Sequence, residues 1–376
     1  MAGVTSGSGQ VGPHLPDGWS ARLPDQDDVP ALVALRLADR TPWTEERSVD
    51  ESAVESEVVG YASWTRRQLA VLDPGGRVRG WIAVQDRAAG RTVVALWLDR
   101  DVADAEAVAV GLYAWADGEG RAIARLRGLE RTRMDASPFA DDHVQRRWLE
   151  AAGYARRRRW LHMTRPVDPT ESHPPLRAGV TVRRVARHGN GVPVASDLQI
   201  VHLMLEESFQ DHFNSYRESF PEFVQRLRED PGHRWDHWWL AFISTPLDTS
   251  ISTPLDTSIS TPLETGISTP LETGNPTYDS HDVPAGAIVC SVLAADRTGA
   301  EGTYVDYIGV NRAARGRGVA KGLLHTVLAD AAERGRDRVS LEVDADSPTR
   351  ADELYVAMGW VTDYATESWF RDVDAS

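Results

Sequence analysis

The hydrophobic pattern of the C-terminal part of the chain changes period near residue 319. Residues 304–310 form a short, mostly apolar run of the kind found in strands. After a polar turn, apolar residues recur three and four positions apart; they are Val319, Ala320, Leu323, Leu324, Val327, Leu328 and Ala331. This spacing predicts a helix with one buried face. A second strand at 338–343 and a helix that ends before Gly359 complete the order.

The N-terminal part repeats this order of elements. Strands are predicted at 19–23, 68–72, 79–84, 92–98 and near 132–136, with helices at 28–38, at about 103–127 and before Tyr154. Further along, strands at 179–184, 237–242 and 285–293 and helices at about 194–208 and 219–229 lead into the C-terminal elements. The alternation of strands and helices predicts an α/β fold class, and 376 residues suffice for two domains.

The domain boundaries follow from composition. We expect a disordered N-terminus at 1–17, a first domain at 18–165, a Pro-rich linker at 166–176 and a second domain at 177–376. An insertion at 243–283 holds four octapeptide copies that begin Ile-Ser-Thr-Pro-Leu. Pro in every copy and few apolar residues predict a flexible loop. Phosphorylation at the Thr-Pro pairs, or binding of a partner, is the open alternative.

Composition restricts the class of protein. A net charge of −15 argues against a nucleic-acid-binding surface, and the run Arg156–Arg159 is interpreted as a solvated strand face. Cys290 is the single cysteine and lies in an apolar run, which predicts a buried residue and a reducing, cytoplasmic location. No signal peptide or membrane-length apolar run is visible, so we expect no membrane contact.

The turn before the helix at 319 has the chemistry of an anion cradle. Gly316 and Gly318 lack Cβ atoms, so the backbone can approach a ligand closely. The first N–H groups of the helix have no acceptor within the helix, and its dipole favours negative charge there. Together with Arg315 and Arg317, these groups predict a phosphate site.

The residues of this turn resemble a known family. Arg315-Gly-Arg-Gly-Val-Ala320 fits the R/Q-x-x-G-x-G/A signature of the GNAT acetyltransferases, and Tyr355-Val-Ala-Met-Gly-Trp360 fits their later Tyr-x-x-x-Gly-aromatic motif. The resemblance spans both halves, as in tandem GNAT proteins such as mycothiol synthase. It implies two domains, each with a central, mostly antiparallel mixed sheet flanked by helices. It also implies acetyl-coenzyme A as co-substrate.

The resemblance implies a set of cofactor-binding positions in the second half. They are Ile308, Gly309, Val310, Arg315, Gly316, Arg317, Gly318, Val319, Ala320 and Ser347, the last standing where the family often has Asn. In the first half the position of the cradle reads Leu98-Asp-Arg-Asp-Val-Ala-Asp-Ala-Glu106, with carboxylates in place of glycines. Carboxylates repel a pyrophosphate, and Trp148 stands at the motif's tyrosine position. We therefore expect only the second half to be catalytic.

Acyl transfer to an amine needs a polarised thioester carbonyl, a base for the amine and an acid for the leaving thiolate. Backbone N–H groups of residues 308–310 are expected at the carbonyl, where Gly309 suits a break in strand pairing. Tyr355 is expected to donate the proton to the thiolate. Alternation places Tyr304, Asp306, Ile308 and Val310 on one strand face, so Asp306 or Tyr304 is a candidate base.

The acceptor site is less defined by the sequence. Glu206, Glu207, Asp211 and His212 lie where the family shapes its acceptor pocket, and they serve either there or as solvated polar residues. His233 and His237 lack the helix and the Glu of a zinc-protease motif, so we expect no metal. The expected activity is N-acetylation of a small amine by a monomer or homodimer. An acyl-coenzyme A-binding or sensing protein is the alternative, and a cysteinyl amino-sugar acceptor, as for mycothiol synthase, has no independent support.

Overall fold

The structure is a computed structural model that describes residues 12–44, 49–87, 90–209, 218–244, 282–295, 299–347 and 350–376. Its first half contains β1 (Ser20–Arg22), α1 (Val29–Arg40), α2 (Glu51–Val58), β2 (Arg66–Leu72), β3 (Val78–Arg87), β4 (Arg91–Leu98), α3 (Ala105–Leu126), β5 (Arg131–Ala136), α4 (His143–Ala151) and β6 (Ala155–Pro166). Short 3-10 turns, η1 (Gln26–Asp28) and η2 (Tyr61–Thr65), precede α1 and β2.

The second half repeats this order. It contains β7 (Val180–Arg184), α5 (Ala195–Phe209), α6 (Phe220–Arg228), β8 (His233–Ser244), β9 (Asp282–Leu293), β10 (Gly302–Val310), η3 (Arg312–Ala314), α7 (Val319–Glu333), β11 (Arg338–Asp344), α8 (Ala351–Ala357) and β12 (Val361–Asp374). Each helix and strand of one half has a counterpart in the other. The predicted α/β class and the repeated order are therefore confirmed.

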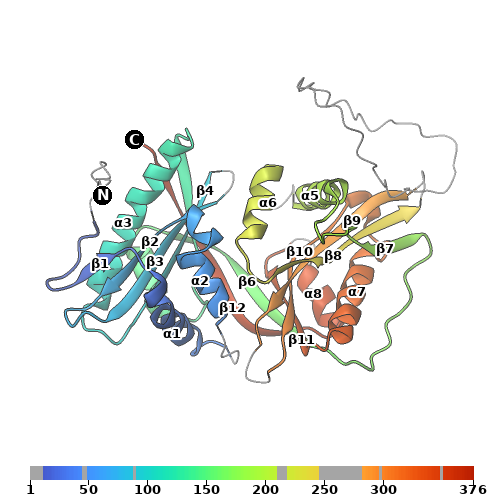
Figure 1. The fold of residues 1–376 in the computed structure, drawn as a ribbon, viewed down its shortest axis with the longest axis horizontal. Coiled ribbons are helices and arrows are strands. Elements are labelled where there is room, and N and C mark those ends of the chain that lie inside the picture. Colours follow the sequence, from blue (N-terminus) through green and yellow to red (C-terminus); the bar gives the residue numbers. More distant parts are fainter. Residues whose placement is uncertain are drawn as a thin grey trace.

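All the described strands belong to one continuous sheet (Figure 1). It has 12 strands in the order β1-β2-β3-β4-β5-β12-β6-β11-β10-β9-β8-β7. Only β4–β5 and β10–β11 are parallel pairs; the other neighbours are antiparallel. If each strand is replaced by its counterpart in the other half, the strand order is the same when it is followed from either edge of the sheet. The two halves are thus related as internal repeats across the central β12–β6 pair.

Each half contributes its last strand to the other half's side of the sheet. β12, from the end of the chain, pairs with β5 of the first half, with Trp369 opposite Ala136. β6, from the first half, pairs with β11 of the second, with Met163 opposite Leu341. The linker that separates the halves in sequence therefore does not separate them in the sheet.

Helices cover both faces of the second half's sheet and enclose two cores. Beneath α7 and α8, the core contains Val305, Leu324, Leu341, Tyr355 and the predicted buried residue Cys290. On the opposite face, α5 and α6 pack on a core that includes Met204, Phe223 and Trp238. The side chains on one face of β10 therefore pack beneath α7 and α8, and those on the other face lie on the side of α5 and α6.

The structure differs from the elements predicted from the sequence in four places. Strand β12, at the centre of the sheet, was not predicted. Helix α2 was not predicted, and β8 starts at His233 and is longer than expected. Residues 12–17 were predicted to be disordered, which is wrong: an added Cβ at Gly111 of α3 would lie 2.0 Å from the His14 carbonyl oxygen and 3.7 Å from Leu15 Cδ2. This segment lies against α3 because Gly111 leaves room for it. Residues 1–11 lie outside the described residues.

The octapeptide repeat lies almost wholly outside the described residues, so its flexible-loop assignment stays a prediction. The described chain on either side ends in β8 and begins in β9, which are antiparallel neighbours. The repeat is therefore inserted between two adjacent strands, at the edge region of the sheet. Within the described residues, no helix has the length and apolar character needed to cross a membrane.

A buried carboxylate forms hydrogen bonds between the two halves. Glu229, directly after α6 and 8% exposed, accepts hydrogen bonds from Thr65 Oγ1 at 2.9 Å, Arg66 Nη1 at 3.1 Å and Gln85 Nε2 at 2.8 Å. Its carbonyl also accepts from Ser56 Oγ at 3.1 Å. Since all four donors belong to the first half, this one residue joins the end of α6 to η2, β2, β3 and α2.

Replacing Glu229 should weaken the whole molecule. Glu229→Ala leaves the buried Arg66 guanidinium without its carboxylate, and we expect a loss of about 3 kcal/mol in free energy of unfolding. Chemical denaturation followed by tryptophan fluorescence measures it. The matched control is Glu150→Ala on the exposed side of α4, which should change stability by about 0.5 kcal/mol or less. Equal losses from both variants would contradict the assignment.

Candidate functional site

The parallel strands β10 and β11 diverge halfway along their length. They are paired only from Thr303–Val305 to Val339–Leu341. Beyond this point β10 stays paired with β9 as far as Val310, and β11 stays paired with β6 as far as Asp344. The described strands thus leave a V-shaped opening between them. Alternate N–H groups of β10 that point toward β11 have no strand partner there.

A β-bulge at Asp306 marks the start of this opening. The register of β10 against β9 jumps from Val305–Cys290 to Tyr307–Val289, so Asp306 is the additional residue. Ser291 Oγ donates to Asp306 Oδ1 at 3.3 Å, and Ser291 pairs with Tyr304 across the strands. Tyr304 and Asp306 therefore share the face of Ser291.

The bulge corrects two predictions about β10. Ile308 and Val310 do not share the face of Asp306 but pack into the core beneath α7, because one added residue inverts the alternation. The irregularity also lies at Asp306 and not at Gly309. Gly309 has another reason to be glycine: an added Cβ would lie 2.7 Å from Ser208 Oγ and 3.1 Å from the Met204 carbonyl oxygen of α5.

The turn predicted to be an anion cradle has two glycines with positive φ. Gly316 and Gly318 have φ values of 77° and 84°, a left-handed conformation that favours glycine. Gly318 is the N-cap of α7, whose first turn contains no acidic residue. Arg315 and Arg317 are exposed beside it, while Val319 is buried and anchors the helix. The start of α7 is therefore open to an anion.

Two of the candidate acceptor residues, on α5, make hydrogen bonds within the second half. Glu207 Oε2 accepts from Asn311 Nδ2 at 2.6 Å, and Asn311 Oδ1 in turn accepts from the Ala313 N–H at 2.8 Å. Glu206 Oε1 accepts from the Glu218 N–H at 3.4 Å. Glu207 thus ties α5 to the cradle. Asp211 and His212, the other candidates, lie outside the described residues.

Tyr355 lies on α8 at the edge of the core beneath α7. Its ring is 6% exposed and makes an edge-on contact with Trp360, with ring centroids 5.9 Å apart. Burial raises the pKa of Tyr355 to about 12, so the phenol keeps its proton at neutral pH. Ser347 lies in the turn between β11 and α8, half-buried, where its carbonyl accepts from the Arg350 N–H at 3.0 Å.

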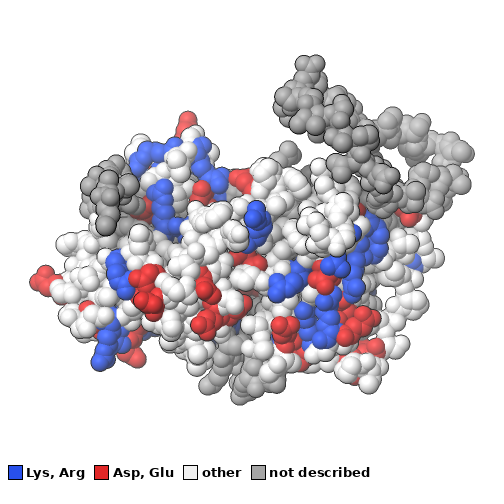
Figure 2. All heavy atoms as spheres, viewed as in Figure 1, with Lys and Arg blue, Asp and Glu red and all other residues white. Residues whose placement is uncertain are grey.

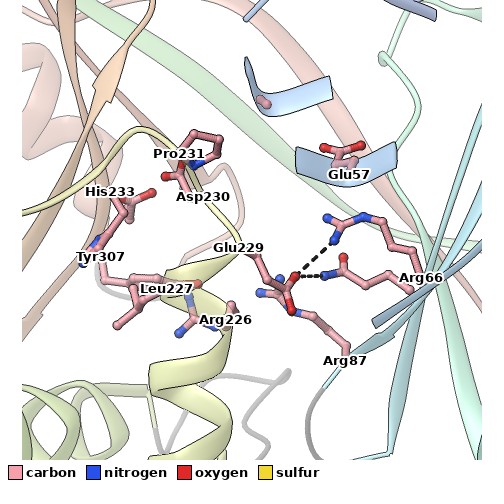
Figure 3. A pocket seen from close by; sticks show the side chains of 13 residues that line it. Glu57, Arg66, Arg87, Arg226, Leu227, Glu229, Asp230, Pro231, His233 and Tyr307 are labelled. Carbon is pink, nitrogen blue, oxygen red and sulfur yellow. Dashed lines mark hydrogen bonds and ion pairs between the residues drawn. The ribbon is translucent and has the colours of Figure 1, made fainter. Parts of the chain in front are cut away.

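Asp306 lines a cavity of about 290 Å³. The cavity lies between the two halves, with Glu57 and Arg66 on one side and Asp230 and His233 on the other (Figure 3). The first half contributes polar side chains from α2, β2 and β3. The second half contributes the end of α6, the start of β8 and the bulge of β10. The ionisable side chains that line it include Glu57, Arg66, Arg226, Asp230, His233 and Asp306. Sequence reasoning missed this cavity, and no motif marks it, because its walls come from segments far apart in the chain.

The electrostatics of this cavity make Asp306 a usable base. Burial raises the pKa of Asp306 to about 7, and the nearby Asp230 carboxylate adds to the rise. Burial likewise raises the pKa of Asp230 and lowers that of His233 to about 4. Tyr304 is the weaker candidate, since burial raises its pKa well above its usual value and its phenol stays protonated.

The first half lacks an open counterpart of this site. β4 and β5 also diverge, after the pair Val93–Asp135, but Gln145 Nε2 of α4 donates to the Leu96 carbonyl oxygen at 3.0 Å there. Arg100, in the acidic turn, bridges Asp142 and Asp39, the latter at 2.7 Å. Side chains of the first half therefore hydrogen-bond to a backbone carbonyl of β4 and to one another beside this divergence.

The position that corresponds to Tyr355 in the first half is Leu149, so the assignment to Trp148 was wrong by one residue. The Tyr154 N–H donates to the Leu149 carbonyl at 2.9 Å, as the Trp360 N–H does to the Tyr355 carbonyl at 3.0 Å. A phenol is absent from this position with either alignment. Among the described residues, no group of three or more His, Cys, Asp or Glu side chains could hold a metal ion.

Comparison with known proteins agrees with this geometry. The model of the "Acetyltransferase (GNAT) family" matches residues 267–360. The fold is similar to that of a GCN5-related N-acetyltransferase from Sphaerobacter thermophilus, at 21% identity and a TM-score of 0.66, over 96% of this chain and 98% of that one. It is also similar to a tandem GNAT protein from the clavulanic acid biosynthesis pathway, at 16% identity and a TM-score of 0.60, over 95% and 99% of the two chains. No curated protein matches this chain by sequence.

The chain therefore has the tandem GNAT fold. Its second half carries the segment that the acetyltransferase family model recognises, and that segment includes the cradle and Tyr355.

The raised pKa of Asp306 should lower stability at high pH. The folded-state pKa of about 7 lies above the ordinary 3.8, so folding favours the protonated form. Stability is highest below the ordinary pKa and falls as pH rises toward and through about 7, above which the full cost of an ionised buried carboxyl is present. Asp306→Asn removes this cost. We expect it to raise the free energy of unfolding by about 1 kcal/mol or more at about pH 8.5, and by less at about pH 5.

Urea denaturation at the two pH values measures the effect. The control is Asp346→Asn on the exposed turn after β11. If Asp306→Asn were no more stable than wild type at the higher pH, Asp306 would titrate as an ordinary carboxyl.

Proposed function

We propose that the protein transfers an acetyl group from acetyl-coenzyme A to the primary amine of a small molecule, and that its second half does so without a covalent enzyme intermediate. The observation that carries this proposal is the joint position of the bulge at Asp306, beside both the opening between β10 and β11 and the cavity between the halves. The family match over the cradle supports acetyl-coenzyme A as the donor.

In this proposal the cavity holds the acceptor, and Asp306 removes a proton from its ammonium group, directly or through water. A base with a pKa near 7 suits this step, because it is ionised at neutral pH yet basic enough to accept a proton. Asp230 and Asp306 together favour a cationic acceptor. Arg66 and Arg226 are already engaged by Glu229 and Glu218, so their charge is largely compensated.

The remaining steps fall to β10 and α8. N–H groups of residues 308–310 that point into the opening would stabilise the negative charge on the thioester oxygen as the amine attacks. When the carbon–sulfur bond breaks, Tyr355 would give its phenol proton to the thiolate. The thiolate then leaves as a thiol, and the nitrogen keeps the acetyl group. The nitrogen would give up its second proton to restore the Tyr355 phenol through water, and Asp306 would release the first proton to solvent, so both side chains end in their starting protonation states.

Turnover and its pH dependence test the proposal. With a panel of small amines and thiol release as the readout, we expect wild-type turnover to rise with pH through about 7, as Asp306 ionises. Asp306→Asn should lower turnover by about 100-fold or more while acetyl-coenzyme A affinity stays within about twofold. Asp346→Asn is the matched control. Tight binding of acetyl-coenzyme A with no thiol release for any amine would instead identify a binding or sensing protein.

Tyr355→Phe tests the acid separately. The substitution removes the hydroxyl group that carries the proton and keeps the ring in its core position, so turnover should fall by about tenfold or more with little change in cofactor affinity. Tyr154→Phe, a buried tyrosine of the first half, is the control and should leave turnover unchanged. Equal turnover in Tyr355→Phe and wild type would rule out Tyr355 as the proton donor.

A further inference from the structure

The linker between the halves lies along α7, on its way to β7 (Figure 1). The ring of His173 stacks on that of His325, with centroids 5.2 Å apart. Leu176 lies over Gly322, where an added Cβ would be 2.7 Å from Leu176 Cδ2. At its start, Arg165 Nη2 donates to both carboxylate oxygens of Glu171, at 2.6 and 2.8 Å. The linker is therefore held against the helix whose N-terminus forms the cradle.

The end of this linker places Arg177 on the cradle itself. Arg177 Nη1 donates to the Gly316 carbonyl oxygen at 2.9 Å. Its side chain also passes over Gly318, where an added Cβ would lie 2.9 Å from Arg177 Cδ and 3.0 Å from Nε. A guanidinium from a segment more than a hundred residues away in sequence thus lies beside the glycines of the predicted phosphate site.

The positive charges around this cradle are uncompensated by carboxylates. Within the described chain, no ion pair joins Arg177, Arg315 or Arg317 to an acidic residue, whereas Arg100 and Arg183 elsewhere each contact buried carboxylates. Lys321, the only lysine in the sequence, is exposed in the first turn of α7. Figure 2 shows that acidic and basic side chains are otherwise interspersed on the face that it presents. In a chain of net charge −15, such a cluster favours a bound anion.

The first half contains the same turn without the arginine. There the Trp19 N–H donates to the Pro16 carbonyl at 3.1 Å, as the Val180 N–H does to the Arg177 carbonyl at 3.0 Å. The turns also share a left-handed glycine, Gly18 with φ 82° and Gly179 with φ 77°. Pro16 therefore occupies the position of Arg177. The first half, whose acidic turn takes the place of the cradle, therefore has a proline at this position. The second half, which has the open cradle, has an arginine there.

We infer that Arg177 is a phosphate-binding residue of the coenzyme A site, contributed by the interdomain linker. This inference rests on the proposed function, because it takes acetyl-coenzyme A as the ligand of the cradle. A guanidinium carries five N–H donors, and Arg177 uses one on Gly316 within the described structure. The remaining N–H groups can bind two phosphate oxygens in the bidentate geometry that arginine favours. The linker then has a binding role besides joining the halves.

Equilibrium binding to three ligands tests the inference. The ligands are acetyl-coenzyme A, acetyl-dephospho-coenzyme A, which lacks the 3′-phosphate, and S-acetylpantetheine, which has no phosphate. Arg177→Ala should weaken acetyl-coenzyme A binding by about tenfold or more, as expected for loss of a charge-assisted hydrogen bond. Arg177→Lys should recover part of the loss. Arg315→Ala reports the cradle, and Arg131→Ala, an exposed arginine of β5, controls for the change in net charge.

The pattern across the ligands identifies the contact. Weaker binding of acetyl-coenzyme A alone assigns Arg177 to the 3′-phosphate, and weaker binding of both nucleotide ligands assigns it to the pyrophosphate. An equal loss for S-acetylpantetheine overturns the inference, because Arg177 would then only position the loop through Gly316. Unchanged affinity in Arg177→Ala also overturns it. If wild type bound no acetyl-coenzyme A, the proposed function would fail first, and Arg315→Ala would then have no effect either.

Discussion

The antiparallel pairing of β6 with β12 is the interaction on which the rest of the structure depends. These strands lie at the centre of the sheet, and through them β5 and β11 become parts of one hydrogen-bonded surface. A shared sheet fixes the angle between the halves more firmly than a flexible linker would, since backbone hydrogen bonds define both spacing and register. It thereby holds α2, β2 and β3 opposite α6 and the bulge of β10. The cavity between the halves exists because of that geometry.

Asp306 shows how the fold combines stability and chemistry at one position. A single additional residue in β10 interrupts the ladder where β11 diverges and turns a carboxyl toward the cavity. Burial beside Asp230 makes the ionised form unfavourable, which weakens the fold but raises basicity. The hydrophobic cores on the two sides of β10 and the hydrogen bonds of Glu229 stabilise the fold enough to offset this cost.

The sequence was sufficient for the local features and insufficient for those that depend on long-range pairing. Periodicity and turn composition predicted most helices and strands, and the turn at Gly316 and Gly318 does lead into a helix at Val319 as predicted. The alternation of side chains assigned the wrong face to the residues after Asp306, because the bulge moves each of them to the opposite face. No residue type in the sequence indicates such a bulge. Glu57 and Asp306 line one cavity across about 250 residues of sequence, and no local pattern reports such proximity. Helix α2 was missed because its eight residues carry few apolar positions.

The exchange of β6 and β12 also constrains how the chain can fold. The first half's strand β5 has β12 as its neighbour, and β12 follows every other described strand in the sequence. During synthesis, therefore, the N-terminal half cannot complete its sheet until Asp374 has emerged, although all its other strands are made long before. Until then, β5 and β6 have exposed edges, which a nascent chain must protect from pairing with other molecules. Contacts between residues so distant in sequence also predict slow folding, limited by the pairing of β12 with β5 and β6.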